Sequence, residues 1–163
     1  LAEKNSKHGK IFCLVDTDTE IDKYQNIPKT NEKKLKIMRL ENCNDSKSTK
    51  LIEAYKVSNN LNPTVIENSL DKVAFIATLK ELASQENNIL QILNDKNNID
   101  NTSNNSFFCF ANMRPNDKEL INNFISTQKV KFAETYIEIV KKQDLNVELD
   151  WVNYIKIFFN GEK

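Results

Sequence analysis

Two acidic residues, Asp16 and Asp18, directly follow the apolar run Ile11–Val15. In an extended chain, residues two apart project on the same side, here about 6 to 7 Å apart. Two like charges at that spacing repel each other unless a cation neutralises them. Carboxylates without His or Cys suit Mg²⁺ or Mn²⁺, which fill their remaining positions with water and phosphate oxygens. Asp16 and Asp18 are therefore candidate metal ligands.

The same pair has a second interpretation that involves no metal. Asp and Thr side chains accept hydrogen bonds from nearby backbone N–H groups, so an Asp-rich strand end is often a solvated turn or a helix N-cap. An Asp-x-Asp spacing does not by itself decide between the two interpretations.

The element that would position these acids is the run Ile11–Val15 itself. Five apolar residues are too few to cross a membrane, and between polar residues they predict a strand covered on both faces. In an open parallel sheet, ligands bind beyond the carboxyl ends of the strands, where Asp16 would lie. The sequence thus predicts an α/β fold with a small, mostly parallel sheet.

Further along the chain, residues 34–41 alternate polar and apolar side chains, which predicts a second strand at an edge of the sheet. Residues 51–57 fit a short helix or a strand, and the helix is favoured. Residues 94–106 consist almost entirely of Asn, Asp, Ser, Thr and Lys, and predict a flexible polar insertion.

The second half of the chain is predicted to be rich in helices. Pro63 suits a first helical turn, and apolar residues then recur at three-to-four-residue intervals up to Leu82. Residues 107–111 predict a buried strand or core segment. Three more helices are expected: one capped by Asp117, one from Lys129, and a last one over residues 150–159.

Composition and charge restrict the classes of function. The 163 residues fit one domain, and 23 basic residues balance 23 acidic ones. A chain of zero net charge has no overall field that attracts nucleic acid, so such binding would need a local patch or another domain. The absence of a signal peptide and of a membrane-length apolar run predicts a cytoplasmic protein that does not bind membranes.

Cysteine and histidine chemistry is poorly supported. Cys13 and Cys109 lie in apolar segments and are expected to be buried, as in a reducing compartment. No Cys-x-x-Cys spacing occurs and His8 is the sole histidine, so neither a zinc site nor a His-activated nucleophile is expected. Residues 1–9 predict the tail of a helix closing at Gly9, which implies that residues upstream are missing.

Three segments, in order, resemble the Toprim nucleases, and among them the overcoming-lysogenization-defect (OLD) family, whose nuclease is attached to an ATPase domain. The first is the strand that ends in Asp16 and Asp18. The second, Thr64-Val-Ile-Glu67-Asn-Ser-Leu70, is similar to a helix of that group that carries an acid before Leu. The third, Gln128-Lys129-Val-Lys131-Phe-Ala133-Glu, is similar to its Lys-x-x-x-Ala helix start.

The resemblance implies roles for four residues. Asp16, Asp18 and Glu67 would bind Mg²⁺ or Mn²⁺, and Lys129 would lie at the scissile phosphate of DNA. Two ions about 3.5 to 4 Å apart can hold the attacking and leaving oxygens of a phosphodiester. A lysine would stabilise the added negative charge of the transition state. Without catalysis, Glu67 would be a first-turn acid favoured by the helix dipole, and Lys129 an exposed side chain.

One departure from the family pattern limits the resemblance. The first motif of the family, a strand followed by a catalytic Glu well upstream of the Asp pair, has no match here, because Glu3 lies on the wrong element. The chain is therefore expected to be a single, N-terminally incomplete Toprim-like domain over residues 1–163, or a relative that has lost catalysis. The missing strand would leave a sheet edge open for another segment, an ATPase partner or a second copy.

Two alternatives to a nuclease stay open. The first is a non-catalytic interaction domain that assembles with an ATPase or another chain, which the missing Glu, the neutral charge and the aromatic last helix favour. The second is a phosphatase of the haloacid-dehalogenase kind, which also begins with Asp-x-Asp after an apolar strand. Glu20 stands where that family has Thr or Val, and no later Asp pair follows a strand.

Overall fold

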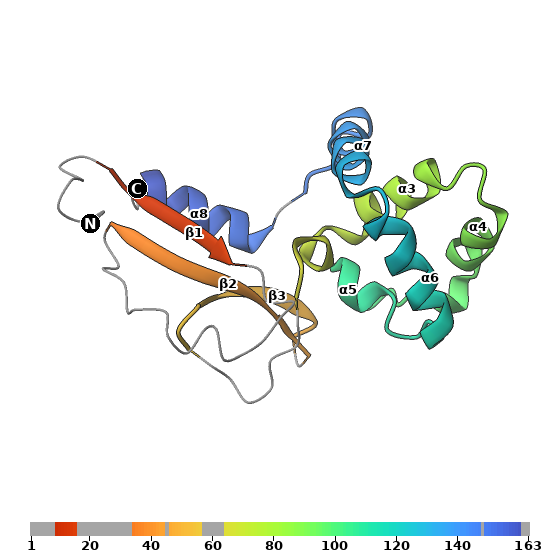
Figure 1. Cartoon of the computed structure of the whole chain (residues 1–163), viewed down its shortest axis with the longest axis horizontal. Coiled ribbons are helices and arrows are strands. Elements are labelled where there is room, and N and C mark those ends of the chain that lie inside the picture. The colour runs from red at the N-terminus through yellow and green to blue at the C-terminus, as the bar shows by residue number, and fades with distance from the viewer. Residues whose placement is uncertain (1–8, 16–33, 45, 57–63, 148, 161–163) are drawn as a thin grey trace. The chain divides into compact units, whose positions relative to one another are not determined.

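The computed structural model describes residues 9–15, 34–44, 46–56, 64–147 and 149–160. The chain divides into two compact units (Figure 1). Unit 1 comprises Leu1–Ile66 and Leu149–Lys163, and unit 2 comprises Glu67–Glu148. The predicted helix tail over residues 1–8 and the predicted helical turn at Pro63 lie outside the described residues.

In unit 1 the described residues form a three-stranded sheet in the order β1-β2-β3, with strands β1 (Ile11–Val15), β2 (Leu35–Cys43) and β3 (Ser48–Glu53). Strands β1 and β2 pair in parallel, and β2 and β3 pair antiparallel. The sheet is therefore mixed, and together with the helix-rich second half it confirms the α/β class. The predicted place of the second strand is wrong, because β2 is the central strand and not an edge.

Strand β3 replaces the short helix that residues 51–57 were predicted to form. It pairs with β2 from Met38↔Glu53 to Cys43↔Ser48, so an antiparallel neighbour satisfies its backbone. Lys47 precedes β3 with a φ of 45°, in the left-handed region that tight turns require. No Gly or Asn occupies position 47, so the usual sequence signal for such a turn is missing there.

Helix α8 (Asp150–Asn160) covers one face of the sheet. The Phe12 ring lies 6.3 Å from the ring of Tyr154 and 5.6 Å from that of Phe158, and Lys36 Nζ bonds to the Tyr154 hydroxyl. Because side chains alternate along a strand, even-numbered residues of β1 and β2 face α8. On β2 they include Met38 and Leu40, which are both buried.

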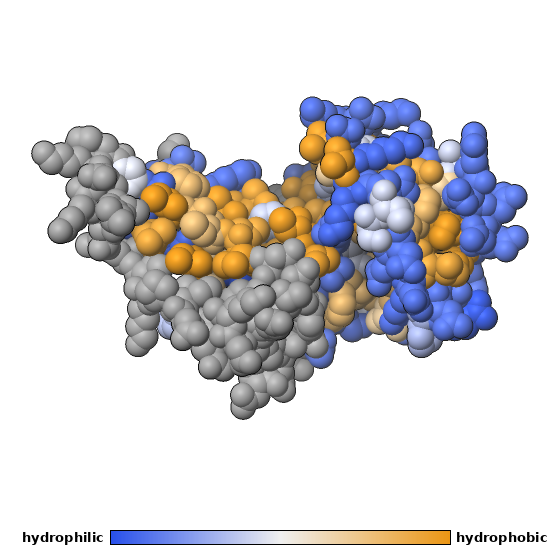
Figure 2. Space-filling model, viewed as in Figure 1, coloured by the Kyte–Doolittle hydropathy of each residue, from blue (hydrophilic) through white to orange (hydrophobic). Residues whose placement is uncertain are grey.

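The opposite face of the sheet carries odd-numbered residues of β1 and β2. Ile11 is 40% exposed and Cys13 is exposed, so the prediction that Cys13 is buried is wrong. Five apolar residues in a row predict cover on both faces, but Ile11 and Cys13 show that this face is open along part of β1. Figure 2 shows hydrophobic residues gathered over the region of β1 and β2.

Unit 2 contains helices around a core of its own. They are a 3₁₀ turn η1 (Ile66–Ser69, entering from unit 1), α3 (Lys72–Leu82), α4 (Asn87–Asn94), η2 (Lys96–Asn98), α5 (Ser106–Cys109), α6 (Pro115–Ser126) and α7 (Lys129–Lys142). Helices α3 and α7 pack together, with the rings of Phe75 and Phe132 5.4 Å apart. The predicted helix starting at Lys129 is confirmed.

Local capping explains where several of these helices begin. The Asp71 side chain accepts a hydrogen bond from the Ala74 N–H and starts α3. Helix α6 begins at Pro115, whose missing N–H costs nothing in the first turn. The predicted capping role of Asp117 is wrong: it lies within the first turn and pairs with Arg114 Nε at 2.9 Å.

Residues 94–106, predicted to be a flexible polar insertion, are hydrogen-bonded to the rest of unit 2. The N–H of Asp100 donates to the Cys109 carbonyl at 2.7 Å, and the N–H of Lys72 donates to the Asn104 carbonyl at 2.8 Å. Asn98, Asp100 and Ser103 are buried. The segment that follows, predicted to be a strand or core segment, forms the short helix α5, which buries Phe108 and Cys109.

No described helix combines the length and the apolar character needed to cross a membrane.

Candidate functional site

Glu67 and Lys129, two of the four candidate catalytic residues, meet in unit 2. Glu67 lies in η1 and Lys129 is the first residue of α7. Lys129 Nζ lies 3.7 Å from Glu67 Oε1, with side-chain exposures of 59% for Lys129 and 22% for Glu67. This distance makes an ion pair but is too long for a good hydrogen bond, so the pair contributes little to stability.

Two partly buried hydrogen bonds hold the backbone around Glu67. Ser106 Oγ donates to the Glu67 carbonyl at 2.6 Å and accepts from the Leu70 N–H at 3.1 Å. Ser106 is itself buried at the start of α5. One hydroxyl thus fastens η1 to α5, and it fixes the direction in which the Glu67 side chain leaves the backbone.

Lys129 is held in place by the packing of α7. The Asp71 N–H donates to the Tyr136 hydroxyl at 3.3 Å, which ties the segment after η1 to the middle of α7. Burial raises the pKa of Tyr136, so this hydroxyl stays protonated at neutral pH. Gln128, the N-cap residue of α7, makes no side-chain capping bond. A cation at a helix N-terminus opposes the helix dipole, so Lys129 does not stabilise α7 through that dipole.

The other two candidate catalytic residues, Asp16 and Asp18, lie outside the described residues. Strand β1 ends at Val15, so the predicted strand has the predicted bounds and the sequence continues directly into Asp16. The described residues contain no group of three or more His, Cys, Asp or Glu side chains able to hold a metal ion. Glu67 supplies one carboxylate of the type that Mg²⁺ prefers.

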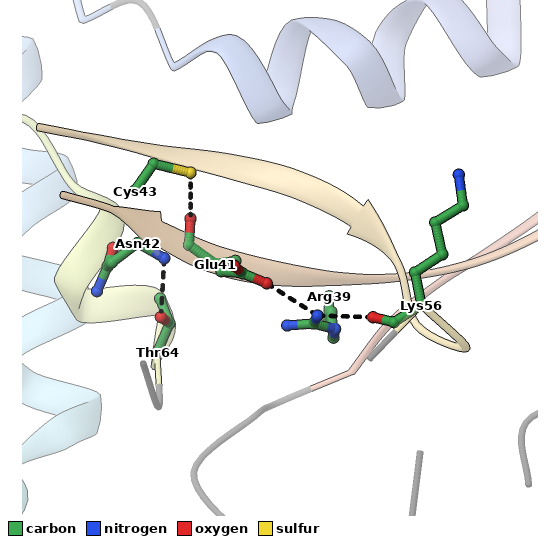
Figure 3. Close-up of polar contacts among 6 residues, drawn as sticks. All are labelled: Arg39, Glu41, Asn42, Cys43, Lys56 and Thr64. Atoms are coloured by element: carbon green, nitrogen blue, oxygen red, sulfur yellow. Dashed lines mark hydrogen bonds and ion pairs between the residues drawn. The ribbon is translucent and has the colours of Figure 1, made fainter. Parts of the chain in front are cut away.

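Unit 1 contains a buried charged pair that the sequence pattern did not predict (Figure 3). Arg39 is 0% exposed, and its Nη2 lies 2.8 Å from Glu41 Oε2 and donates to the Lys56 carbonyl at 2.8 Å. Its Nε and Nη1 are buried and have no hydrogen-bond partner within the described part of the chain. Arg39 is the register partner of Val15, so this cation lies beside the carboxyl end of β1.

Asn42, the residue after Glu41 on β2, forms hydrogen bonds between uncharged groups that anchor Thr64 to the sheet. The Asn42 N–H donates to Thr64 Oγ1 at 3.2 Å, and Thr49 Oγ1 donates to Asn42 Oδ1 at 2.7 Å (Figure 3 draws the first of these). All three residues are buried. This network fixes Thr64, the first residue of the segment that leads to η1.

Cys109 is excluded as a nucleophile by its surroundings. It is fully buried, its thiol donates to the Ser106 carbonyl at 3.0 Å, and burial raises its pKa to about 12. A thiol with that pKa holds almost no thiolate at neutral pH. The prediction that Cys109 is a core residue is confirmed.

Known proteins provide no assignment. No family model matches the sequence, and the comparisons with curated proteins and with solved structures found no match. The resemblance to the Toprim nucleases therefore depends on the three sequence motifs and on the ion pair between Glu67 and Lys129.

Proposed function

We propose that this chain is the nuclease module of a metal-dependent DNA endonuclease that works with an ATPase domain or partner chain. The observation that supports it best is the ion pair between Glu67 and Lys129. These residues come from two separate motifs, 64–70 and 128–134, and the fold of unit 2 brings their side chains within 3.7 Å. An acid that binds a metal and a lysine that contacts the scissile phosphate require such proximity.

Each residue has a distinct role in this proposal. Asp16, Asp18 and Glu67 bind Mg²⁺ or Mn²⁺, and the bound metal supplies the positive charge that a phosphodiester needs during cleavage. Lys129 stabilises the charge that develops on the phosphate oxygens. Ser106 is a positioning residue, since its hydroxyl bonds to the backbone of Glu67 and Leu70.

A nicking assay on supercoiled plasmid, with Mg²⁺ or Mn²⁺ and with a chelator, tests the proposal. We expect metal-dependent nicking by the wild type, and loss of about 100-fold or more in Asp16→Ala, Glu67→Gln and Lys129→Ala. Glu119→Gln and Lys131→Ala are matched controls, because both side chains are exposed and lie on α6 and α7. Nicking that survives in Asp16→Ala, or that falls equally in the controls, would show that these residues do not form an active site.

The second candidate is a non-catalytic interaction domain, which exposed apolar residues favour. Val130, next to Lys129, is 74% exposed, and Ile137 on the same helix is 53% exposed. Exposed apolar side chains on one helix favour an interaction surface where they form part of a larger apolar patch. A defined complex that forms equally well with the wild type and with Asp16→Ala, and no cleavage with either metal, would support this function over the nuclease.

A further inference from the structure

We propose that the ion pair between Glu67 and Lys129 couples the binding of a divalent cation to the binding of DNA. Each side chain is the counter-ion of the other in the structure. A cation that binds Glu67 therefore frees Lys129 for a phosphate, and a phosphate that binds Lys129 frees Glu67 for a cation. This inference rests on the proposed function and concerns the regulation of the same site.

Each side chain of the pair competes with a ligand of the other. Lys129 Nζ lies 3.7 Å from Glu67 Oε1, and within the described part of the chain this is the only ion pair of either side chain. An ammonium group and a divalent cation both seek the carboxylate oxygens of Glu67, and the two cations repel each other. The Glu67 carboxylate and a phosphate likewise compete for Lys129.

The surroundings of the pair indicate that Lys129 is the side chain that moves. The Ser106 hydroxyl holds the backbone around Glu67, whose side chain is 22% exposed. The Lys129 side chain is 59% exposed and has a flexible four-carbon stem. At 3.7 Å the two charged groups are too far apart for a good hydrogen bond, so little free energy opposes their separation.

The size of the coupling follows from the exposure of the pair. An ion pair that water reaches stabilises a protein by only about 0.2 to 1 kcal/mol, which corresponds to a change in affinity of about two- to five-fold. Because binding free energies are linked, the metal should strengthen DNA binding by the same factor by which DNA strengthens metal binding. Salt should weaken both effects, since it screens exposed charges.

The first test measures Mn²⁺ binding by electron paramagnetic resonance, without DNA. We expect Lys129→Ala to bind Mn²⁺ about two- to five-fold more tightly than the wild type, although the same variant loses nicking. Lys131→Ala is the matched control, because it removes the same charge from an exposed position of the same helix. Lys129→Arg keeps a cation beside Glu67 and should bind Mn²⁺ as the wild type does. A lysine that only stabilises the fold would not raise the Mn²⁺ affinity when removed.

The second test measures the binding of a fluorescent DNA duplex in the presence of a chelator. We expect Glu67→Gln to bind the duplex about two- to five-fold more tightly than the wild type, because Lys129 has lost its counter-ion. The double variant Glu67→Gln/Lys129→Ala should not show this gain. Glu119→Gln, which removes an exposed acid from α6, is the control for the change in net charge. Circular dichroism checks that each variant keeps the wild-type fold.

The outcomes separate this coupling from the proposed function. Lys129→Ala that binds Mn²⁺ no more tightly than Lys131→Ala, or Glu67→Gln that binds DNA no more tightly than Glu119→Gln, overturns the coupling. If the wild type still nicks plasmid with metal, the nuclease is unaffected by that result. Both affinity changes without any nicking would support the coupling and overturn the nuclease. A wild type that neither binds Mn²⁺ nor nicks plasmid overturns both.

Discussion

At the scale of single residues, Arg39 and Glu41 place an ion pair inside unit 1, where water solvates neither charge well. Arg39 is 0% exposed and Glu41 is 8% exposed. Removing two charges from water costs several kcal/mol per ion, and their mutual attraction only partly offsets that cost. Removing either side chain therefore leaves the other as a buried charge without its partner, which destabilises unit 1.

We expect Arg39→Met to lower the free energy of unfolding by about 3 kcal/mol, because Glu41 then keeps a buried charge without its guanidinium partner. The double variant Arg39→Met/Glu41→Leu should recover most of that loss, since neither charge remains. Urea unfolding of Arg39→Met, Glu41→Leu and the double variant measures the coupling energy between the two side chains. Lys156→Met on α8, where the side chain is exposed, is the control for removing a cation alone. A double variant as unstable as the sum of the singles would mean that the residues are not coupled.

The sequence could not have predicted this pair, because Arg and Glu in an alternating strand are ordinarily solvent-exposed. The alternating pattern over residues 34–41 predicts a strand, and the structure has β2 there. It could not show that β2 is central, because that depends on β1 and β3 pairing on either side. Cys13 shows the opposite error. The apolar run around it predicts burial, but the residue is exposed, because burial depends on what packs against the strand.

At the scale of the elements, the structure shows which local sequence patterns are sufficient to predict a helix or a strand. The bounds of β1 and the starts of α7 and α8 follow from apolar runs and periodicity, and they are found where the sequence predicts them. The sequence does not predict strand β3, because the seven-residue pattern over residues 51–57 fits a helix equally well and the pairing with β2 decides between helix and strand. The sequence predicts a flexible insertion over residues 94–106, because polar composition does not reveal hydrogen bonds to distant backbone groups.

The same limit applies to the candidate site. Two separate sequence motifs predict Glu67 and Lys129 as site residues, and the structure shows that their side chains form an ion pair. Ser106, which positions Glu67, was not predicted, because one Ser among many polar residues has no periodic signal. Only the fold shows that its hydroxyl bridges the Glu67 carbonyl and the Leu70 N–H.

We therefore expect Ser106→Ala to destabilise unit 2 by about 1 to 3 kcal/mol, since it leaves two partly buried backbone groups without their partner. Because η1 is then less firmly held, nicking should also fall, with the metal requirement unchanged. Ser84→Ala, at an exposed position in the same unit, is the matched control. Thermal unfolding checks the stability and the plasmid assay checks the activity. A Ser106→Ala variant as stable as Ser84→Ala would contradict the bridging role of this hydroxyl.

At the scale of the whole molecule, the two units differ in how the chain builds them. Unit 2 is one continuous segment, 67–148, with its own core. Its most deeply buried apolar side chains come from five different helices: Leu79, Leu93, Cys109, Ile121 and Phe132. Unit 1 is discontinuous, because α8 returns from the far end of the chain to cover the sheet.

This difference predicts opposite results for two truncations. Residues 67–148 alone should fold, since every residue of the buried core cluster lies within that segment. Residues 1–148 should keep unit 2 but lose the sheet, because removing α8 exposes the face that carries Phe12, Met38 and Leu40. That exposed apolar face should make the longer fragment aggregate.

Cys109 provides the measurement, because it is the only cysteine in residues 67–148 and its thiol is fully buried. In a folded fragment it should resist a thiol reagent until urea unfolds the fragment, and labelling should then follow the same cooperative transition as the helical circular dichroism. The Leu79→Ala variant of the fragment should shift both transitions together to lower urea, by about 2 to 5 kcal/mol of unfolding free energy. If Cys109 in the isolated fragment is labelled without urea, unit 2 is not an independent folding unit, and its core needs the rest of the chain.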